Sequence, residues 1–253
     1  MDTGTIHLVG AGPGDPELLT LRAARLLASA ELVVHDGLVS EPIMAMVNPA
    51  AERISVAKRR ARHTLPQEEI GALMVARALA GQRVVRLKGG DPFIFGRGGE
   101  EVDAARAAGI AVEVVPGITS ASGCAAATLT PLTHRDAASI VSFVAGQCKG
   151  LTDQDWAGLA GKGRTLVIYM GLATAAQINE KLIADGLSPD TPVAVIENGT
   201  RAAMRARRTI LTDLADMIAR EAMESPGLII VGEVVRFGTA DDVLMLARQK
   251  EWA

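Results

Sequence analysis

Strand-like apolar runs alternate with helical windows through the first part of the chain. The runs are TIHLV, ELVVH, RISV, QRVVRLK and AVEVV, and the windows include LLTLRAARLLAS, QEEIGALMVARALAG and VDAARAAG. In the first window Leu19, Ala23, Leu26 and Leu27 recur at helical spacing and predict the face that packs on a sheet. Strand, helix and strand in succession favour parallel pairing, because the helix returns the chain to the end where the first strand began.

The pattern changes after PLTHRDAAS, where strand-like runs follow one another more closely. These runs are SIVSFVAG, RTLVIYMG, TPVAVIENG, RRTILT and GLIIVGEVV, with helices such as AAQINEKLIADG among them. Such spacing is typical of a mixed α/β domain. We therefore expect an α/β protein of two domains, residues 1–134 and 135–253, joined near Pro131 to Asp136.

Charge and hydropathy give no support to a nucleic-acid or membrane partner. The 253 residues include 26 basic and 29 acidic side chains, so any basic site must be local. The start, MDTGTIHLVG, lacks the basic region and long apolar run of a signal peptide, and no apolar run reaches the length of a membrane span. We expect a cytoplasmic protein.

The cysteines and histidines do not suggest a disulfide framework or a metal site. Cys124 and Cys148 have no C-x-x-C partner and suit small core residues of a reduced enzyme. The four histidines are not spaced as ligands, so no metal is expected.

The first glycine loop, HLVGAGPGDPELL, follows a strand, and Asp36 closes the next strand, as in a Rossmann dinucleotide-binding fingerprint. That fingerprint, G-x-G-x-x-G, would require glycine where the chain has Asp15. Asp15, Pro16 and Glu17 instead predict an N-cap, a first helical residue and a first-turn acid, and two carboxylates there would repel a pyrophosphate. An NAD-linked oxidoreductase remains an alternative that rests on this loop and Asp36 alone, and a simple tight turn is another.

A second glycine-rich loop lies within VVRLKGGDPFIFGRGGEE and belongs at the carboxyl edge of a parallel sheet, where open α/β folds bind ligands. Asp91 precedes a proline and should be extended, with a carboxylate free to accept from a hydroxyl or ammonium group. Lys88 belongs to the strand end, so no phosphate-binding lysine follows the glycines and the ligand should be neutral or cationic. The glycines allow positive φ and close approach of backbone to ligand. They are Gly89, Gly90, Gly96, Gly98 and Gly99.

Other polar residues could serve either structure or a site. Thr119 and Ser120 in VVPGITSASGC predict a helix cap that faces the same edge. Arg97 and Glu100, three residues apart, predict a solvated ion pair from their spacing alone. Two basic clusters suit either a solvated surface or the lining that a polycarboxylate substrate would need. They are Lys58, Arg59, Arg60, Arg62 and His63, and His134 with Arg135.

Several long motifs occur in order along almost the whole chain. They are VGAGPGDPELLTL, VVHDGLVS, VAKR followed by PQEEI, RLKGGDPFIFGRGGEE, VPGITSASG, PLTHRD, IYMG and GEVV. With them the chain resembles the uroporphyrinogen-III C-methyltransferases of the tetrapyrrole methylase family. The resemblance implies a class III methyltransferase fold, two α/β domains with the active-site cleft between them, rather than a Rossmann methyltransferase. It also implies a homodimer and S-adenosylmethionine as cofactor, with S-adenosylhomocysteine as product.

The resemblance also carries site residues over, motif by motif. Asp36 and Lys58 match positions assigned to acid and base work, and Arg97, Glu100 and Arg135 match residues placed near the tetrapyrrole. The chain has Ala145-Gly146-Gln147 where the family often has T-G-H, which leaves the role of Gln147 open. The implied cofactor site comprises Pro13, Gly89, Gly90, Asp91, Ile94, Thr119, Ser120, Met170 and Gly199.

The implied reaction methylates C2 and then C7 of uroporphyrinogen III and gives precorrin-2 through precorrin-1, in siroheme or cobalamin biosynthesis. We expect arginine to clamp the substrate rather than to act as the base, because arginine has a very high pKa. The dehydrogenase and chelatase module fused to some relatives is missing, so siroheme synthesis by this chain alone is not expected. The alternatives are another precorrin C-methyltransferase, a relative that methylates protein or RNA, and a ligand sensor without enzymatic activity.

Overall fold

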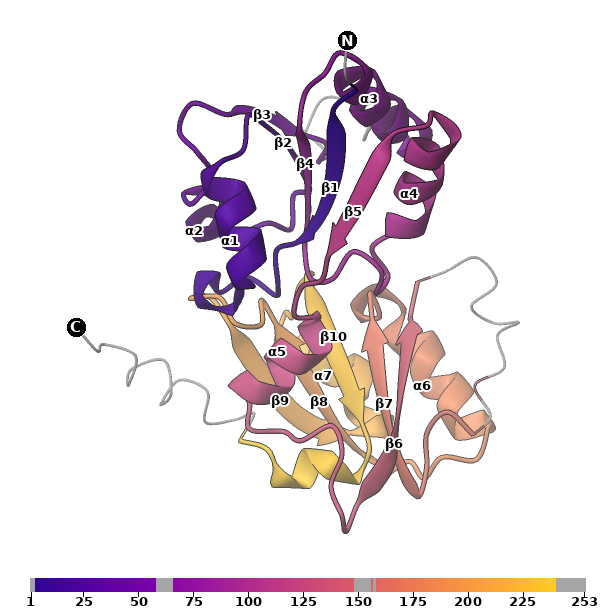
Figure 1. Ribbon diagram of the computed structural model, residues 1–253. Helices are drawn as coiled ribbons and strands as arrows, with labels where there is room; N and C mark the ends of the chain where they lie inside the picture. Colours follow the sequence, from indigo (N-terminus) through magenta and orange to yellow (C-terminus); the bar gives the residue numbers. More distant parts are fainter. Residues whose placement is uncertain (1–2, 58–65, 148–155, 157, 240–253) are drawn as a thin grey trace, which may run out of the picture. The chain divides into compact units, whose positions relative to one another are not determined.

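The computed structural model describes residues 3–57, 66–147, 156 and 158–239, and the chain divides into two compact units, Met1–Thr119 and Ser120–Ala253. Each unit contains a β-sheet with helices packed on it (Figure 1). The boundary between the units, after Thr119, comes earlier in the sequence than the expected boundary between residues 134 and 135. The reason is helix α5, Ser120–Ala127, whose Ala121 and Cys124 pack into an apolar cluster of the second unit.

The described strands of the first unit form a parallel sheet in the order β3-β2-β4-β1-β5, as the alternating pattern predicted. The carboxyl ends of all these strands therefore lie at one edge. The elements are β1 Thr5–Gly10, η1 Pro16–Leu18, α1 Leu21–Ala28, β2 Leu32–His35, α2 Glu41–Met44, β3 Glu52–Ser55, α3 Gln67–Leu79, β4 Val84–Lys88, α4 Gly98–Ala107 and β5 Ala111–Val115.

Helices cover both faces of this sheet (Figure 1). Val85 and Leu87 of β4 belong to the apolar cluster that includes Leu27 of α1. Val84 belongs to the opposite cluster, which includes Met74 of α3. This three-layer arrangement buries the sheet and leaves its carboxyl edge as the place where loops gather.

The first helical window begins in two steps. Asp15 caps the short η1 turn, because its Oδ1 accepts from the N–H of Glu17 at 3.0 Å. Thr20 then caps α1 by accepting from the N–H of Ala23 at 3.1 Å. The expected cap at Asp15 is confirmed for the short turn, whereas the main helix begins later and leaves Leu19 outside it.

The strand order contradicts the dinucleotide-binding alternative. In a Rossmann sheet the first and second strands are neighbours, so a glycine loop and a ribose-binding acid follow adjacent strands. Here β4 lies between β1 and β2, which separates the loop after β1 from Asp36 after β2. The NAD-linked oxidoreductase rested on those two features and was wrong.

The second unit has a mixed sheet in the order β6-β7-β10-β8-β9, as its closely spaced strands predicted. Strand β6 pairs with β7 in parallel, and β7 and β8 are both antiparallel to β10. The carboxyl ends of β6, β7 and β8 therefore share one edge. Helices α6 and α7 cover one face, and α5 with η4 covers the other. The further elements are β6 Ala138–Ala145, β7 Gly163–Tyr169, η2 Leu172–Thr174, α6 Ala175–Ala184, β8 Pro192–Glu197, β9 Arg205–Ile210, η3 Leu211–Asp213, α7 Leu214–Arg220, β10 Gly227–Val231 and η4 Glu233–Phe237.

Candidate active site

Backbone hydrogen bonds join the two glycine loops at the carboxyl edge of the first sheet. The N–H of Gly12 donates to the carbonyl of Gly90 at 3.1 Å, and the N–H of Gly90 donates to the carbonyl of Gly12 at 2.8 Å. The N–H of Ala11 also donates to the carbonyl of Lys88 at 2.7 Å. The loops after β1 and β4 are therefore held together by main-chain atoms.

Three glycines allow these loops and the loop after β5 to pack backbone on backbone. A Cβ atom at Gly10 would lie 2.5 Å from the backbone nitrogen of Gly117 and 2.8 Å from the carbonyl oxygen of Gly90. Gly90 itself has a φ of 68°, a conformation that side chains disfavour. Glycine is required here so that three loops can meet.

Contacts within the chain also explain other glycines of the second loop. A Cβ atom at Gly89 would lie 2.9 Å from the Cβ of Leu38, and one at Gly96 would lie 2.6 Å from the carbonyl oxygen of Pro92. Gly98 faces the same Pro92 oxygen. The sequence suggested close approach to a ligand, but at these positions the atom approached belongs to the protein.

The Asp91 carboxylate holds the second loop to the loop after β5. Its Oδ1 accepts from the N–H of Phe93 at 2.8 Å, and its Oδ2 accepts from the N–H of Gly117 at 3.0 Å. Aspartate commonly forms such bonds to a backbone N–H two residues on. The carboxylate is therefore not without partners, as the sequence suggested, because each of its oxygens accepts from one loop amide.

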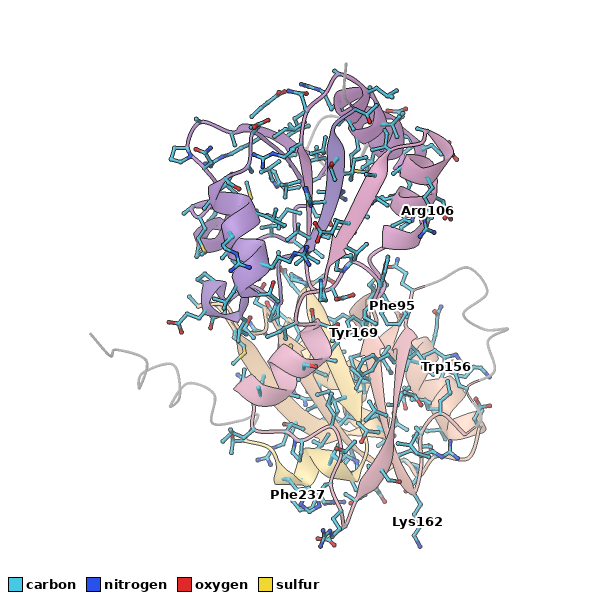
Figure 2. All side chains as sticks on the ribbon, viewed as in Figure 1. Phe95, Arg106, Trp156, Lys162, Tyr169 and Phe237 are labelled. Carbon is cyan, nitrogen blue, oxygen red and sulfur yellow. The ribbon has the colours of Figure 1, made fainter. Side chains whose placement is uncertain are left out.

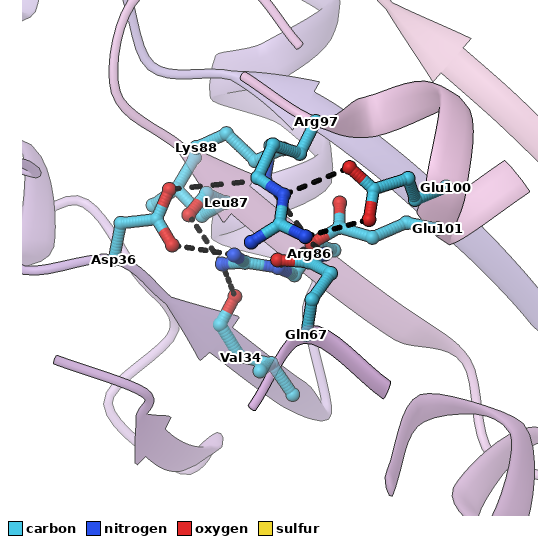
Figure 3. Close-up of polar contacts among 9 residues, drawn as sticks. All are labelled: Val34, Asp36, Gln67, Arg86, Leu87, Lys88, Arg97, Glu100 and Glu101. Atoms are coloured by element: carbon cyan, nitrogen blue, oxygen red, sulfur yellow. Dashed lines mark hydrogen bonds and ion pairs between the residues drawn. The ribbon is translucent and has the colours of Figure 1, made fainter. Parts of the chain in front are cut away.

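Arg97 and Glu100 form the solvated ion pair that their spacing predicted (Figure 3). Arg97 Nε donates to Glu100 Oε1 at 2.8 Å and Nη2 donates to Oε2 at 2.7 Å, with the side chains 59% and 54% exposed. The hydrogen bonds to Arg97 lower the pKa of Glu100, and Glu100 raises the pKa of Arg97. Arg97 is therefore a permanent cation, and Glu100 is a weakened base.

Asp36 lies just after β2 and contacts two buried cations of β4 (Figure 3). Arg86 Nη2 donates to Asp36 Oδ1, and Lys88 Nζ lies 3.9 Å from Asp36 Oδ2. The Asp36 side chain is 28% exposed, whereas Arg86 is 1% exposed and Lys88 is 3% exposed. Asp36 is thus held by two buried cations, while its side chain is partly exposed.

Sequence reasoning missed this buried cluster, although a signal was present. Arg86 and Lys88 alternate along β4 and so point to one face of a buried strand. Buried cations need buried anions, and Glu101 of α4 supplies one, since it accepts from Arg86 Nε at 3.0 Å. Burial, followed by the neighbouring Arg86, lowers the pKa of Lys88.

The other proposed residues of the first unit lie along the same carboxyl edge. Pro13 is buried in the first loop, and Ile94 is exposed between two exposed phenylalanines, Phe93 and Phe95. Thr119 is the last residue of the unit. Lys58, like the arginines and His63 of its cluster, lies outside the described residues.

In the second unit, Ser120, Met170 and Gly199 lie at the carboxyl edge of the sheet. The Tyr169 hydroxyl at the end of β7 (Figure 2) accepts from the N–H of Ala121 at 3.1 Å, which holds the start of α5 there. A Cβ atom at Gly199 would overlap Cys124 Sγ of the same helix. The sequence therefore brings three proposed cofactor residues to one edge, and Tyr169 is a supporting residue that it did not reveal.

Backbone conformations at this edge are unusual. Met170 has a φ of 55°, Asn198 has 51° and Thr200 has 66°, although none of them is glycine. Such conformations are uncommon and gather at functional sites, where surrounding structure maintains them. The segments IYMG and IENGT thus have the strain typical of a ligand site.

Arg135 lies elsewhere in the second unit. It is exposed in the turn before Ala138, where β6 begins, and the N–H of Ala138 donates to the carbonyl of His134 at 2.9 Å. Ala138 pairs with Gly163, whereas the opposite end of β6, Ala145, pairs with Tyr169. The structure therefore does not bring Arg135 together with Met170 and Gly199.

Comparisons with known proteins match nearly all of both units. The sequence model of the Tetrapyrrole (Corrin/Porphyrin) Methylases matches residues 5–215. A siroheme synthase of Pseudomonas paraeruginosa is 53% identical over 237 residues, which are 93% of this chain and 51% of that protein. The chain thus spans about half the length of this curated relative.

Solved structures share both the fold and much of the sequence. A uroporphyrin-III C-methyl transferase from Thermus thermophilus, complexed with S-adenyl homocysteine, is 41% identical with a TM-score of 0.79, covering 92% of this chain and 99% of that one. A cobalt precorrin-4 methyltransferase is 28% identical with a TM-score of 0.81, covering 91% and 95%. The class III methyltransferase fold with two α/β units is confirmed. The TM-scores of the two structures are similar, so fold similarity alone does not distinguish the uroporphyrin-III enzyme from the precorrin-4 enzyme.

Proposed function

The chain belongs to the tetrapyrrole methylase family, and on that basis we propose that it is an S-adenosylmethionine-dependent uroporphyrinogen-III C-methyltransferase. It would methylate C2 and C7 and release precorrin-2 formed through precorrin-1. The observation that carries the proposal is the likeness to the Thermus enzyme, since sequence identity is higher there than with the precorrin-4 enzyme at a similar TM-score. The proposal covers methylation alone, because the siroheme synthase relatives are about twice as long.

The proposed cofactor residues have a charge that suits a sulfonium compound. Pro13, Gly89, Gly90, Ile94 and Thr119 are uncharged, and the adjacent Asp91 is an anion, so this set would favour a ligand with sulfonium and ammonium groups. In the second unit, Ser120, Met170 and Gly199 are uncharged too. When bound, S-adenosylmethionine supplies an electrophilic methyl group, which a pyrrole carbon takes while sulfur keeps the electron pair of the broken bond. Backbone groups at the carboxyl edge of the first sheet would align it and exclude water.

Asp36 is the group best suited to take the proton that the macrocycle must release for each methyl gained. Its Oδ1 accepts from Arg86, while Oδ2 makes the longer ion pair with Lys88 Nζ, at 3.9 Å. Glu100 is less suited, because Arg97 occupies both of its oxygens and lowers its pKa. We assign proton removal to Asp36 and acid or base assistance to Lys58.

Arg97 is suited to clamp a carboxylate of the substrate. Glu100 takes hydrogen bonds from its Nε and Nη2, and a guanidinium has five N–H groups, so Nη1 can still donate. Glu100 would then orient Arg97 rather than react.

Arg135 supports a homodimer as part of the proposal. Within one chain the eight residues of β6 separate Arg135 from Met170, a span of about 25 Å at roughly 3.3 Å per residue. Arg135 could therefore serve the Met170 edge from a second copy. Mixing an Arg135→Ala chain with an Asp36→Asn chain would then restore turnover in heterodimers, and no recovery in dimers shown to have exchanged would remove Arg135 from the site.

A cytoplasmic location completes the proposal. Cys124 is a buried free thiol, as suits a reducing compartment. Among the residues that the structure describes, no helix is both long and apolar enough to cross a membrane.

The test is anaerobic incubation of the protein with uroporphyrinogen III and S-adenosylmethionine, followed by product mass and S-adenosylhomocysteine yield. Gain of two methyl groups with two equivalents of S-adenosylhomocysteine is expected, and reactions without S-adenosylmethionine are the control. Methylation of later precorrins but not of uroporphyrinogen III would favour the precorrin methyltransferase alternative instead.

A further inference from the structure

Two adjacent glutamates of α4 lie in opposite surroundings. Glu100 is exposed and paired with Arg97, whereas the Glu101 side chain is fully buried. The family resemblance assigned a place to Glu100 and none to Glu101. Burial of an ionisable side chain without partners is strongly unfavourable, so the contacts of Glu101 require an explanation.

Three donors converge on one oxygen of Glu101 (Figure 3). Oε1 accepts from Arg86 Nε at 3.0 Å, from Lys88 Nζ at 3.1 Å and from Gln67 Nε2 at 3.0 Å. Oε2 is buried and has no hydrogen-bond partner among the described residues. Glu101 is therefore positioned by cations from β4 while half of its carboxylate is unsatisfied.

The two cations connect Glu101 to Asp36. Arg86 contacts Glu101 through Nε and Asp36 through Nη2, while its Nη1 lies 3.4 Å from the carbonyl of Val34 and 3.3 Å from that of Leu87. Lys88 lies between the same two carboxylates. Two cations thus connect a buried anion, Glu101, to a partly exposed anion, Asp36.

Stability alone is a poor explanation for this arrangement. Well-packed apolar residues in place of buried ion pairs are often as stable or more stable, and an unsatisfied buried oxygen is a further cost. The cluster ends at Asp36, a partly exposed carboxylate at the carboxyl edge, which suggests a role in placing that carboxylate.

We propose that Glu101 is a positioning residue, which fixes Arg86 and Lys88 so that they hold the Asp36 carboxylate in one orientation for proton removal. The inference rests on the proposed function, in which Asp36 takes the proton. Without the negative charge of Glu101, the two cations would compete for Asp36 and their geometry would change.

The test is Glu101→Gln, which keeps the shape of the side chain and removes its charge. We expect kcat to fall roughly tenfold or more, within the range of coupled neighbours, while the KM values and the dissociation constant for S-adenosylhomocysteine change less than about twofold. The double variant with Asp36→Asn should turn over no more slowly than Asp36→Asn alone. The matched control is Glu113→Gln, since Glu113 also pairs with His7 and Arg22 in the first unit and does not belong to this cluster.

Several results would overturn the inference. A kcat of Glu101→Gln within about twofold of wild type would do so. Parallel losses of kcat and of S-adenosylhomocysteine affinity in that variant would also do so. A third such result is a double variant whose loss of kcat equals the product of the losses from Glu101→Gln and Asp36→Asn. Where Glu101→Gln does not fold, Glu101→Asp, which keeps the charge but moves it away from Arg86 and Lys88, is judged by the same criteria. If wild-type protein binds S-adenosylhomocysteine but methylates no uroporphyrinogen III, the proposed function has failed. If Asp36→Asn keeps wild-type turnover, the role of Asp36 has failed, and the positioning role with it.

Discussion

The hydroxyl of Tyr169 accepts a hydrogen bond from the backbone N–H of Ala121 at 3.1 Å, and so joins the end of β7 to the start of α5. Ser120 and Met170 are the adjacent residues, one beside each partner. Tyr169→Phe should therefore lower the free energy of unfolding by about 1 kcal/mol and weaken S-adenosylhomocysteine binding measured by calorimetry. Phe143→Leu, which removes the ring 5.9 Å from Tyr169 but keeps the hydroxyl, is the control. Equal affinity in Tyr169→Phe and wild type would show that the bond does not support the cofactor residues.

Gly199 and Cys124 should behave as a complementary pair. A Cβ at Gly199 would overlap Cys124 Sγ, so Gly199→Ala should lower stability by about 1–3 kcal/mol. Cys124→Ala in the same chain should recover much of that loss, because the Cβ of residue 124 lies 3.6 Å from the new methyl group. Urea unfolding of the four chains gives the coupling, and strictly additive effects would contradict the proposed clash.

Gly117 should tolerate substitution far less than Gly99. A methyl group at Gly117 would overlap the carbonyl oxygen of Gly90, which is main chain and cannot rotate away. At Gly99, within α4, a methyl group would meet open space and favour the helix by about 0.5–1 kcal/mol. Thermal unfolding should therefore separate Gly117→Ala from Gly99→Ala in opposite directions.

His7 should make stability depend on pH on the acidic side. Burial, followed by Arg83 and Arg22, lowers the pKa of His7 below its usual 6.5. The unfolded chain then takes up a proton more readily than the folded one as the pH falls below 6.5, so acid favours unfolding. Urea midpoints at several pH values should show a smaller acid loss for His7→Gln than for wild type, and parallel curves would argue against this role.

Much of the fold could be predicted because burial imposes regular patterns on a sequence. Strands of the first sheet are covered on both faces and appear as apolar runs, and Leu27 recurs at helical spacing because α1 packs on that sheet. The unit boundary was less accessible, since whether α5 packs with one unit or the other depends on tertiary contacts of small residues such as Ala121.

The sequence predicted where in the fold the candidate site lies, but not which of its residues contact one another. Glycine loops and strand ends identified the edges, but the partners of Asp91 and the network behind Asp36 depend on residues far apart in sequence, such as Asp36 and Arg86. The resemblance to a family could not show that Arg135 and Met170 lie at opposite ends of the β6 and β7 pair. A sequence motif identifies residues but does not say how far apart they lie in the fold.

The hydrogen bonds between the loops after β1, β4 and β5 should affect the rate of amide hydrogen exchange. Because the amides of Gly12, Gly90 and Gly117 donate to groups in other loops, none can exchange its hydrogen with solvent unless neighbouring loops separate too. These amides should therefore exchange slowly and at similar rates, as one cooperative unit, although they lie outside helices and strands. A cooperative unit of the protein would then consist of loops.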